Sequence, residues 1–347
     1  MTSLPEHREP WNAHVPRRSV LLAGGLVGVA AAGVACSSPS SVKTGPVSAG
    51  TDDLFPGFET RSLPTSRGEL HARVGGSGPP VLLLHGYPET HLMWHAVAPL
   101  LAQGFTVVAT DLPGYGDSFK PPASTDHINH SKRAMAVDHV EAMASLGHDR
   151  FPVVGHDRGG RVGYRFALDH PKVVSRLAVL DIIPTGEVWR RAEQNFARSY
   201  WHWGFLALAA PVPERLISGD PDAFFEAFTR VGFGVDPQVY PEAVKRAYRA
   251  QLDSAQVVEA HCEDYRAGAT INVTHDEADH EEGRRIECPL LTLWGGKGAL
   301  PKFYGDVLAV WKEWADDVSG SAVDAGHYLP EEKPTEVAEM LRKFLSA

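Results

Sequence analysis

Residues 153–161 have the sequence Val153-Val154-Gly155-His156-Asp157-Arg158-Gly159-Gly160-Arg161. An apolar run enters a glycine-flanked turn, and a helical pattern then continues as far as Pro171. Glycines at these positions let the backbone turn sharply and let a strand and a helix approach closely. The pattern therefore predicts a strand, a tight turn and a helix, with Asp157 presented at the turn.

The chain around this stretch alternates strand patterns with helical patterns. Apolar strand patterns occur at 81–84, 105–110, 151–154, 177–180 and 290–294, and an amphipathic helix pattern occurs at 134–146. From about residue 58 onward, this alternation predicts a mostly parallel sheet with helices on both faces. Together with the turn at Asp157, it predicts an α/β-hydrolase fold.

Roughly a hundred residues between the last two strand patterns lack any strand signal and are rich in Trp, Tyr, Phe and Arg. We predict a helical cap at 186–285, inserted between core segments 58–185 and 286–347. Ligands of open α/β sheets bind beyond the carboxyl ends of the strands. The cap is therefore expected to close over Asp157.

The first residues are predicted to direct export rather than to join the fold. Pro16-Arg17-Arg18-Ser19 and the apolar stretch up to Ala35 are typical of a twin-arginine signal at 1–36, followed by a linker at 37–57. Cys36 follows Gly33-Val34-Ala35, as in a bacterial lipoprotein processing site. Simple cleavage after Ala35 and an uncleaved anchor are the alternatives. The expected location is periplasmic, cell-surface or secreted, with a lipid anchor on Cys36 as one outcome.

Composition narrows the class of protein further. The 347-residue chain is 43% hydrophobic, which suits one large α/β domain with an insertion. A net charge of −10 disfavours nucleic acid or an anionic membrane surface as a partner. Cys262 and Cys288 could pair in an oxidising compartment. Their neighbours place them on different predicted elements, which favours two buried thiols.

Asp157 stands where esterases carry a serine nucleophile. A carboxylate can displace a leaving group from carbon and form an ester, which water then hydrolyses. His327, in the loop Ala325-Gly326-His327, is the predicted base for that water. Asp181 follows the strand pattern at 177–180 and is its predicted partner, because residues 294–298 offer no acid. Helix capping by Asp181 is the alternative, and Asp324 is interpreted as a loop residue.

Hydrolysis of an ester also needs donors for an oxyanion. The loop His85-Gly86-Tyr87-Pro88 follows a strand, so the backbone N–H groups of Tyr87 and Arg158 are the predicted donors, and His85 is interpreted as structural. Arg158 and Arg161 lie three residues apart at the start of the predicted helix, where they favour binding of a substrate carboxylate. The argument is stronger for Arg158, which directly follows Asp157. Pairing with acidic surface residues is the alternative.

From about residue 62 to the end, the chain resembles the haloacetate dehalogenases, and among them the fluoroacetate-cleaving enzymes. The matching stretches are His85-Gly86-Tyr87-Pro88-Glu89-Thr90-His91, Met93-Trp94-His95, Asp111-Leu112-Pro113-Gly114-Tyr115-Gly116, Gly155-His156-Asp157-Arg158-Gly159, Leu180-Asp181-Ile182-Ile183-Pro184-Thr185, Cys262-Glu263-Asp264-Tyr265-Arg266-Ala267-Gly268-Ala269 and Gly326-His327-Tyr328-Leu329-Pro330-Glu331-Glu332. Two positions depart from the family pattern. Phe228 aligns near a position where the family has a Trp in the cap, and Tyr87 stands where the family more usually has Phe.

The resemblance implies roles for individual residues of this chain. It implies that Asp157 is the nucleophile, His327 the base, Asp181 its partner, and that Arg158 and Arg161 hold the substrate carboxylate. It also implies that His202, Trp203 and Tyr265 bind the halide, whereas without it Trp203 would be interpreted as cap core. Converging N–H and O–H donors are also what a strongly hydrated fluoride requires on leaving.

The predicted function is hydrolysis of a small 2-halo acid, without cofactor or metal, with a small organic acid and water as partners. An epoxide hydrolase is the nearest alternative, because the same three catalytic residues can open epoxides. It would need two cap hydroxyls, of which Tyr265 is the evident one, and it leaves both arginines unexplained. A binding protein without activity is the third hypothesis, and a homodimer stays open.

Overall fold

The computed structural model describes residues 51, 54–230 and 239–347, without the side chains of 228–230. The predicted signal at 1–36, with Cys36, lies outside the described residues, as do most of the predicted linker and the side chain of Phe228. Within the described part of the chain, no helix has the length and apolar character needed to cross a membrane.

One sheet of eight strands forms the centre of the described chain, in the order β1-β2-β4-β3-β5-β6-β7-β8. The pairs β1–β2 and β2–β4 are antiparallel, and all other neighbouring pairs are parallel. This confirms the predicted mostly parallel sheet. The strands are β1 (Phe58–Pro64), β2 (Glu69–Gly76), β3 (Pro80–Leu84), β4 (Thr106–Thr110), β5 (Phe151–His156), β6 (Val174–Leu180), β7 (Leu290–Gly295) and β8 (Val318–Val323).

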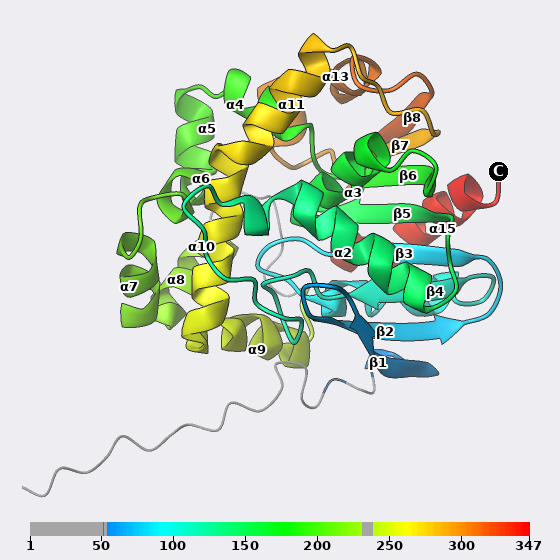
Figure 1. Cartoon of the computed structure of the whole chain (residues 1–347), viewed down its shortest axis with the longest axis horizontal. Helices are drawn as coiled ribbons and strands as arrows, with labels where there is room; N and C mark the ends of the chain where they lie inside the picture. Colours follow the sequence, from blue (N-terminus) through cyan, green and yellow to red (C-terminus); the bar gives the residue numbers. More distant parts are fainter. Residues whose placement is uncertain (1–50, 52–53, 231–238) are drawn as a thin grey trace, which may run out of the picture. The chain divides into compact units, whose positions relative to one another are not determined.

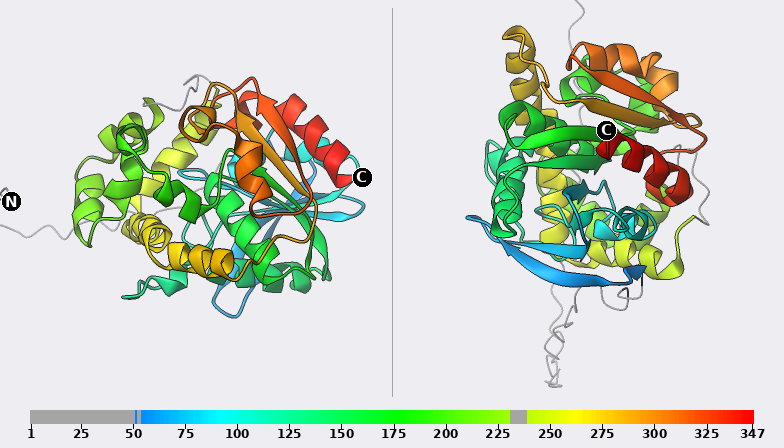
Figure 2. Two further views of the ribbon diagram at one scale, coloured as in Figure 1. Left: turned by 90° about the horizontal axis from the view of Figure 1, so that it is seen from above. Right: turned by 90° about the vertical axis from the view of Figure 1, so that its right-hand side faces the viewer.

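Helices cover both faces of this sheet, which is why its central strands are continuous apolar runs. Helices α2 and α3 lie on one face, and α15 lies on the other, where it packs with α1 (Figure 1, Figure 2). The helical elements of the core are α1 (Ala98–Leu101), α2 (Lys132–Ser145), α3 (Asp157–Asp169), α12 (Leu300–Tyr304), α13 (Val307–Lys312), α14 (Leu329–Glu332) and α15 (Pro334–Leu345), with the 3-10 turns η2 (His91–Trp94) and η3 (Ile128–His130).

The described residues between β6 and β7 contain helices and no strand. They gather at one end of the sheet, on the left in Figure 1. The longest, α10, starts at a Ser254 side-chain cap and packs against α6, α7 and α11. These elements are α4 (Thr185–Arg190), α5 (Gln194–Ser199), α6 (Trp201–Leu206), α7 (Val212–Gly219), α8 (Pro221–Arg230), α9 (Glu242–Ala250), η4 (Gln251–Asp253), α10 (Ala255–Ala269) and α11 (Ile271–Glu281).

The turn between β5 and α3 requires its glycines. A Cβ on Gly155 would lie 2.4 Å from the Gly159 carbonyl oxygen, and a Cβ on Gly159 would lie 2.4 Å from the Leu84 carbonyl oxygen. Asp157 itself has φ of 40°, which is costly for a residue other than glycine. This tight packing presents the Asp157 side chain at the carboxyl end of β5, as the sequence predicts.

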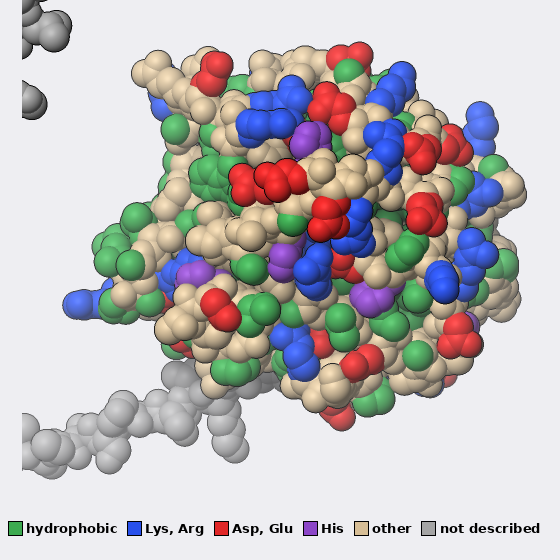
Figure 3. Space-filling model, turned by 45° about the horizontal axis from the view of Figure 1, so that its top comes forward, with side chains coloured by type: hydrophobic (Ala, Val, Ile, Leu, Met, Phe, Trp, Pro, Cys, Tyr) green, Lys and Arg blue, Asp and Glu red, His purple; other side chains and the backbone are tan. Residues whose placement is uncertain are grey.

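Charged side chains of both signs are interspersed on the face of the molecule that Figure 3 shows. No extended basic area is visible on that face, so nothing there resembles the electrostatic footprint of a nucleic-acid site.

Candidate active site

Asp157 is held in place by the backbone of the opposite loop. The Tyr87 N–H donates to Asp157 Oδ1 over 3.1 Å, which leaves the second carboxylate oxygen available for attack. Arg158 N–H, the other predicted oxyanion donor, lies in the first turn of α3, where N–H groups have no acceptor within the helix. Burial raises the pKa of Asp157, but the charges of His327 and Arg161 outweigh burial and hold it well below its usual range. The Asp157 carboxylate is therefore ionised at neutral pH.

His327 and Asp181 form a buried pair beside Asp157. His327 Nδ1 and Asp181 Oδ2 are 2.6 Å apart, and the Gly295 N–H donates to Asp181 Oδ1 over 2.9 Å. Asp181 does not cap the next helix, because α4 begins at Thr185 without a side-chain cap. Asp324 lies at the surface in an ion pair with Lys297. The structure thus brings together the three residues to which the sequence assigns catalysis.

Asp157, Asp181 and His327 line a small cavity between the core and the cap. It has about 10 Å³ of space for the centre of a water-sized sphere, roughly enough for one water molecule. A substrate larger than a water molecule therefore enters only if lining side chains or the cap move. Its other lining residues are Arg161, Ile183, Val188, Phe196, Tyr200, Trp203, Leu300 and Tyr304.

The two arginines differ in their surroundings. Arg158 is fully buried and gives Nε and Nη2 to the carboxylate of Asp264, a buried cap residue, over 2.9 and 2.8 Å. Arg161 lines the cavity and bonds the Ile183 carbonyl and the Thr185 hydroxyl, and no carboxylate among the described residues lies within 4.0 Å of it. A buried cation without an acidic partner is unfavourable. Arg161 is therefore the better suited of the two to bind an anion.

His202, Trp203 and Tyr265 form an aromatic cluster beside the cavity. The ring centroids of His202 and Tyr265 are 5.7 Å apart, and those of Trp203 and Tyr265 are 6.2 Å apart. Burial lowers the pKa of His202 to about 3, so its ring is neutral. Burial and the charge of Asp157 raise the pKa of Tyr265, so its hydroxyl stays protonated. All three side chains can donate a hydrogen bond, although only Trp203 lines the cavity directly.

A buried pair that the sequence analysis missed links the catalytic segments. Glu89 Oε2 lies 3.0 Å from His156 Nδ1 and accepts the Gly86 N–H over 2.9 Å. His156 Nε2 lies 2.8 Å from the His327 carbonyl oxygen. The pair therefore joins the loop at Gly86, the residue before Asp157 and the loop that carries His327. The sequence shows an acid at Glu89 and a histidine next to Asp157, but nothing in their positions along the chain indicates that the two side chains are in contact.

Replacing His156 with Gln is expected to destabilise the protein in a pH-dependent way. Burial lowers the pKa of His156, but Glu89 and Asp157 raise it by more, to about 9. A histidine whose pKa is raised in the folded state stabilises the fold. This stabilisation is complete below the pKa of the unfolded state, roughly 6.5, and is lost as the pH rises through about 9. Its full size is on the order of 3 kcal/mol. Urea unfolding should show a stability difference between wild type and variant that shrinks from about pH 6 to about pH 9.5. A constant difference would contradict a charged His156.

Other polar clusters near the site have structural partners. His85 Nε2 accepts the Leu112 N–H, and burial lowers its pKa to about 4, which agrees with its interpretation as structural. His71, His91 and Asp111 group their ligand atoms within 4.8 Å of one another. Asp111, however, already accepts the His91 and Asp117 N–H groups and contacts His91 Nδ1. Its carboxylate holds this loop and does not need a metal ion.

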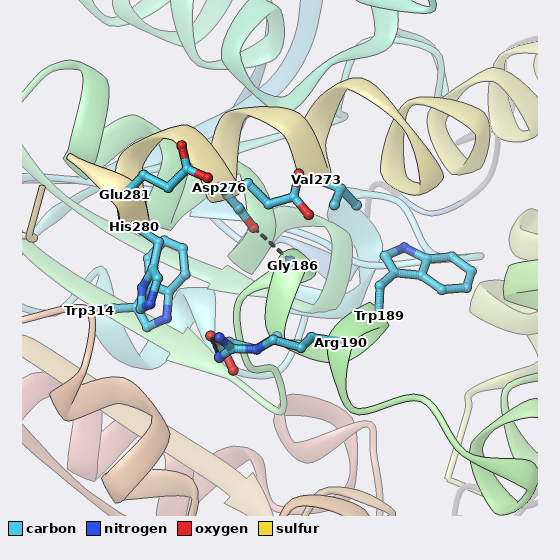
Figure 4. Close-up of a pocket in the computed structure, with 10 residues that line it drawn as sticks. Gly186, Trp189, Arg190, Val273, Asp276, His280, Glu281 and Trp314 are labelled. Atoms are coloured by element: carbon cyan, nitrogen blue, oxygen red, sulfur yellow. Dashed lines mark hydrogen bonds and ion pairs between the residues drawn. The ribbon is translucent and has the colours of Figure 1, made fainter. Parts of the chain in front are cut away.

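A second and larger hollow, about 380 Å³, lies beside α4 and α11 (Figure 4). It is lined by Trp189, Arg190, Asp276, His280 and Trp314, among others. Asp276 points to the Gly186 N–H, from which it accepts a hydrogen bond over 2.8 Å. Among the described residues, Asp276 Oδ2 accepts from the Gly186 N–H and the Tyr164 hydroxyl and not from His280. The size of the hollow alone does not indicate a catalytic site.

Both described cysteines are unpaired. Cys262 is buried in α10, whereas Cys288 is only partly buried ahead of β7. The expectation of two thiols agrees with this arrangement, except that the second is less buried than expected.

Fold and site together define an α/β hydrolase with an aspartate at the nucleophile position. A family model described as alpha/beta hydrolase fold matches residues 79–334. The chain therefore belongs to the alpha/beta hydrolase family, and the protein is a hydrolase.

Within that family the chain is similar to dehalogenases and epoxide hydrolases. It is 44% identical to the fluoroacetate dehalogenase of Burkholderia sp over 299 residues, covering 84% of this chain and 95% of that protein. It is 34% identical to the soluble epoxide hydrolase of Corynebacterium sp. (strain C12), covering 80% and 93%. The crystal structure of a Nostoc sp PCC 7120 alpha/beta hydrolase matches with a TM-score of 0.81 and 48% identity, covering 83% and 98%. The resemblance to the haloacetate dehalogenases is confirmed.

Proposed function

We propose that this protein hydrolyses small 2-halo carboxylic acids, such as fluoroacetate or chloroacetate, to the 2-hydroxy acid and halide. The main support is that Asp157 shares a small cavity with Arg161, a cation that has no ion-pair partner within 4.0 Å among the described residues. The substrate carboxylate would supply that partner and would set the α-carbon against Asp157. The similarity to a fluoroacetate dehalogenase supports the same substrate class.

The first step is displacement at the α-carbon. The free oxygen of Asp157 attacks that carbon, and the halide leaves with the electrons of the carbon–halogen bond. An ester between Asp157 and the substrate results. Donors on His202, Trp203 and Tyr265 would replace part of the water that solvates the departing halide, which matters most for fluoride.

The second step is hydrolysis of this ester. His327 removes a proton from water, and the hydroxide attacks the carbonyl carbon of the ester. Asp181 stabilises the imidazolium, and the Tyr87 N–H stabilises the oxyanion on the carbonyl oxygen that it already contacts. Collapse of the intermediate expels the 2-hydroxy acid, whose alkoxide takes the proton from His327. Asp157 is left as a carboxylic acid, which loses its proton to water and becomes a carboxylate again.

A substrate panel tests the proposal. Purified residues 51–347 should release halide from fluoroacetate and chloroacetate, and should turn over neutral chloroacetamide at least about tenfold less efficiently, because the amide cannot neutralise Arg161. Styrene oxide is included for diol formation. Halide release from neither acid, together with diol formation, would overturn the proposal in favour of an epoxide hydrolase.

Epoxide hydrolysis is the second candidate, and one observation favours it. The cap residue Tyr200 borders the same cavity as Asp157. Tyr265 does not line this cavity, but it is close enough for the charge of Asp157 to act on it, so the cap holds two tyrosines near Asp157. Two hydroxyls can activate an epoxide oxygen. This candidate supplies no carboxylate to Arg161, which has no ion-pair partner within 4.0 Å among the described residues, and we therefore place it second.

We also propose that the protein is exported and acts outside the cytoplasm. The twin-arginine pattern at Arg17-Arg18 and the apolar stretch up to Ala35 support this proposal. Cell fractionation of the full chain tests it. Metabolic labelling with a fatty acid, compared between wild type and Cys36→Ser, distinguishes a lipid anchor from simple cleavage.

A further inference from the structure

Asp264, on the cap helix α10, is the point where three groups of the core converge. Its side chain is fully buried. It accepts hydrogen bonds from Arg158 Nε and Nη2 over 2.9 and 2.8 Å, from Lys132 Nζ over 2.6 Å and from the Tyr115 hydroxyl over 2.7 Å. Its backbone carbonyl accepts a further bond from Arg158 Nη2 over 2.8 Å. Such a set of charge-assisted bonds has little freedom to rearrange.

These contacts fix the orientation of the Arg158 guanidinium. The guanidinium carbon lies 4.2 Å from the Tyr265 ring centroid. A Cβ on Gly268 would lie only 3.1 Å from Nη2, so α10 packs closely against the group. The remaining nitrogen, Nη1, is buried and has no hydrogen-bond partner among the described residues. Arg158 therefore presents one unused donor, and its other edge is neutralised by Asp264.

Without this restraint, Arg158 has a nearby alternative partner. Its charge already acts on Asp157, the residue that precedes it. A guanidinium released from Asp264 can turn to the nucleophile and pair with it, which would remove a donor from the substrate and occupy the attacking oxygen. Arg161 is the contrasting case, because its hydrogen bonds within the described residues go to neutral oxygens and it faces the cavity.

We propose that Asp264, braced by Lys132 and Tyr115, is a positioning residue for substrate binding: it holds Arg158 away from Asp157 and leaves Nη1 to share the substrate carboxylate with Arg161. This inference rests on the proposed function, since it concerns binding of a carboxylate at the same site. It makes a cap residue that does not touch the substrate a determinant of affinity for the substrate.

The test compares variants that release or displace Arg158 with a matched control. Asp264→Asn combined with Lys132→Met removes one buried charge of each sign, which avoids leaving Lys132 buried without its acid. Gly268→Ala changes no charge and pushes the guanidinium by a few tenths of an ångström. Glu263→Gln is the control, because the neighbouring Glu263 bonds His127 and Arg266 rather than Arg158.

The readouts are the dissociation constant of acetate by calorimetry, which requires no turnover, and KM for chloroacetate. We expect the acetate dissociation constant and KM to rise about tenfold in the double variant and about threefold in Gly268→Ala. The kcat of Gly268→Ala should be nearly unchanged, and Glu263→Gln should be close to wild type in all three quantities. A merely structural role would lower thermal stability and leave the acetate constant unchanged.

Unchanged acetate binding in both variants would overturn the inference, as would an equal loss in Glu263→Gln or a wild type that binds no acetate. If the wild type binds acetate but releases no halide, the proposed function fails, and the acetate comparison still decides the role of Asp264.

Discussion

Asp157→Asn is expected to reduce halide release from chloroacetate by at least about 10⁴-fold. The amide is a far weaker nucleophile than the carboxylate, so the halide is not displaced and the carbon–halogen bond stays intact. The substitution conserves side-chain shape, and the amide oxygen can still accept the Tyr87 N–H. The fold should therefore persist. Chloride release under saturating substrate, measured beside thermal unfolding, is the appropriate assay.

Asp324→Asn is the control for this prediction. Asp324 is also an acid and lies three residues before His327, but it is exposed in an ion pair with Lys297. This variant should retain nearly full activity. Appreciable halide release by a folded Asp157→Asn protein would show that another group attacks the substrate.

His327→Gln is expected to stop the reaction after its first step. Attack by Asp157 needs no base, so the variant should release about one equivalent of halide per active site. Hydrolysis of the ester needs a base for water, so steady turnover should fall by at least about 10³-fold. Rapid-quench measurement of chloride, with enzyme near the substrate concentration, separates the burst from turnover.

The covalent ester should accumulate on the His327→Gln protein and be visible in its intact mass as one carboxymethyl group. The double variant Asp157→Asn with His327→Gln serves as the control and should show neither burst nor adduct. Loss of turnover with no burst in His327→Gln alone would mean that His327 acts before or during displacement of the halide.

The features that the sequence predicted best are those determined by local backbone chemistry. Gly155 and Gly159 are needed for close contacts at a turn that places Asp157 at the end of a strand, and this requirement is visible in the residues themselves. The position of Asp181 after the next strand follows from the same logic, because carboxyl ends of parallel strands share one edge of the sheet. The antiparallel pair β1–β2 had a weaker signal and was not predicted as strands, although Gly68 lies in its connecting turn.

The surroundings of the two arginines could not be predicted, because they depend on how the cap packs against the core. Arg158 and Asp264 are 106 positions apart, and no spacing rule joins them. Sequence reasoning favoured Arg158 as the carboxylate ligand because it follows the nucleophile. In the structure, Asp264 neutralises Arg158, so Arg161 is the cation with less of its charge compensated. The Glu89–His156 pair was missed for the same reason, since only packing brings the two residues together.

A single turnover in water enriched in oxygen-18 tests the central claim most directly, with enzyme in excess over chloroacetate. If Asp157 forms the ester and water attacks its carbonyl carbon, the first glycolate carries an unlabelled oxygen from Asp157, and the heavy isotope appears in the peptide that contains Asp157. Mass spectrometry of product and digest measures both. Heavy oxygen in the first glycolate, with an unlabelled Asp157, would contradict the account and would indicate direct attack of water on the α-carbon.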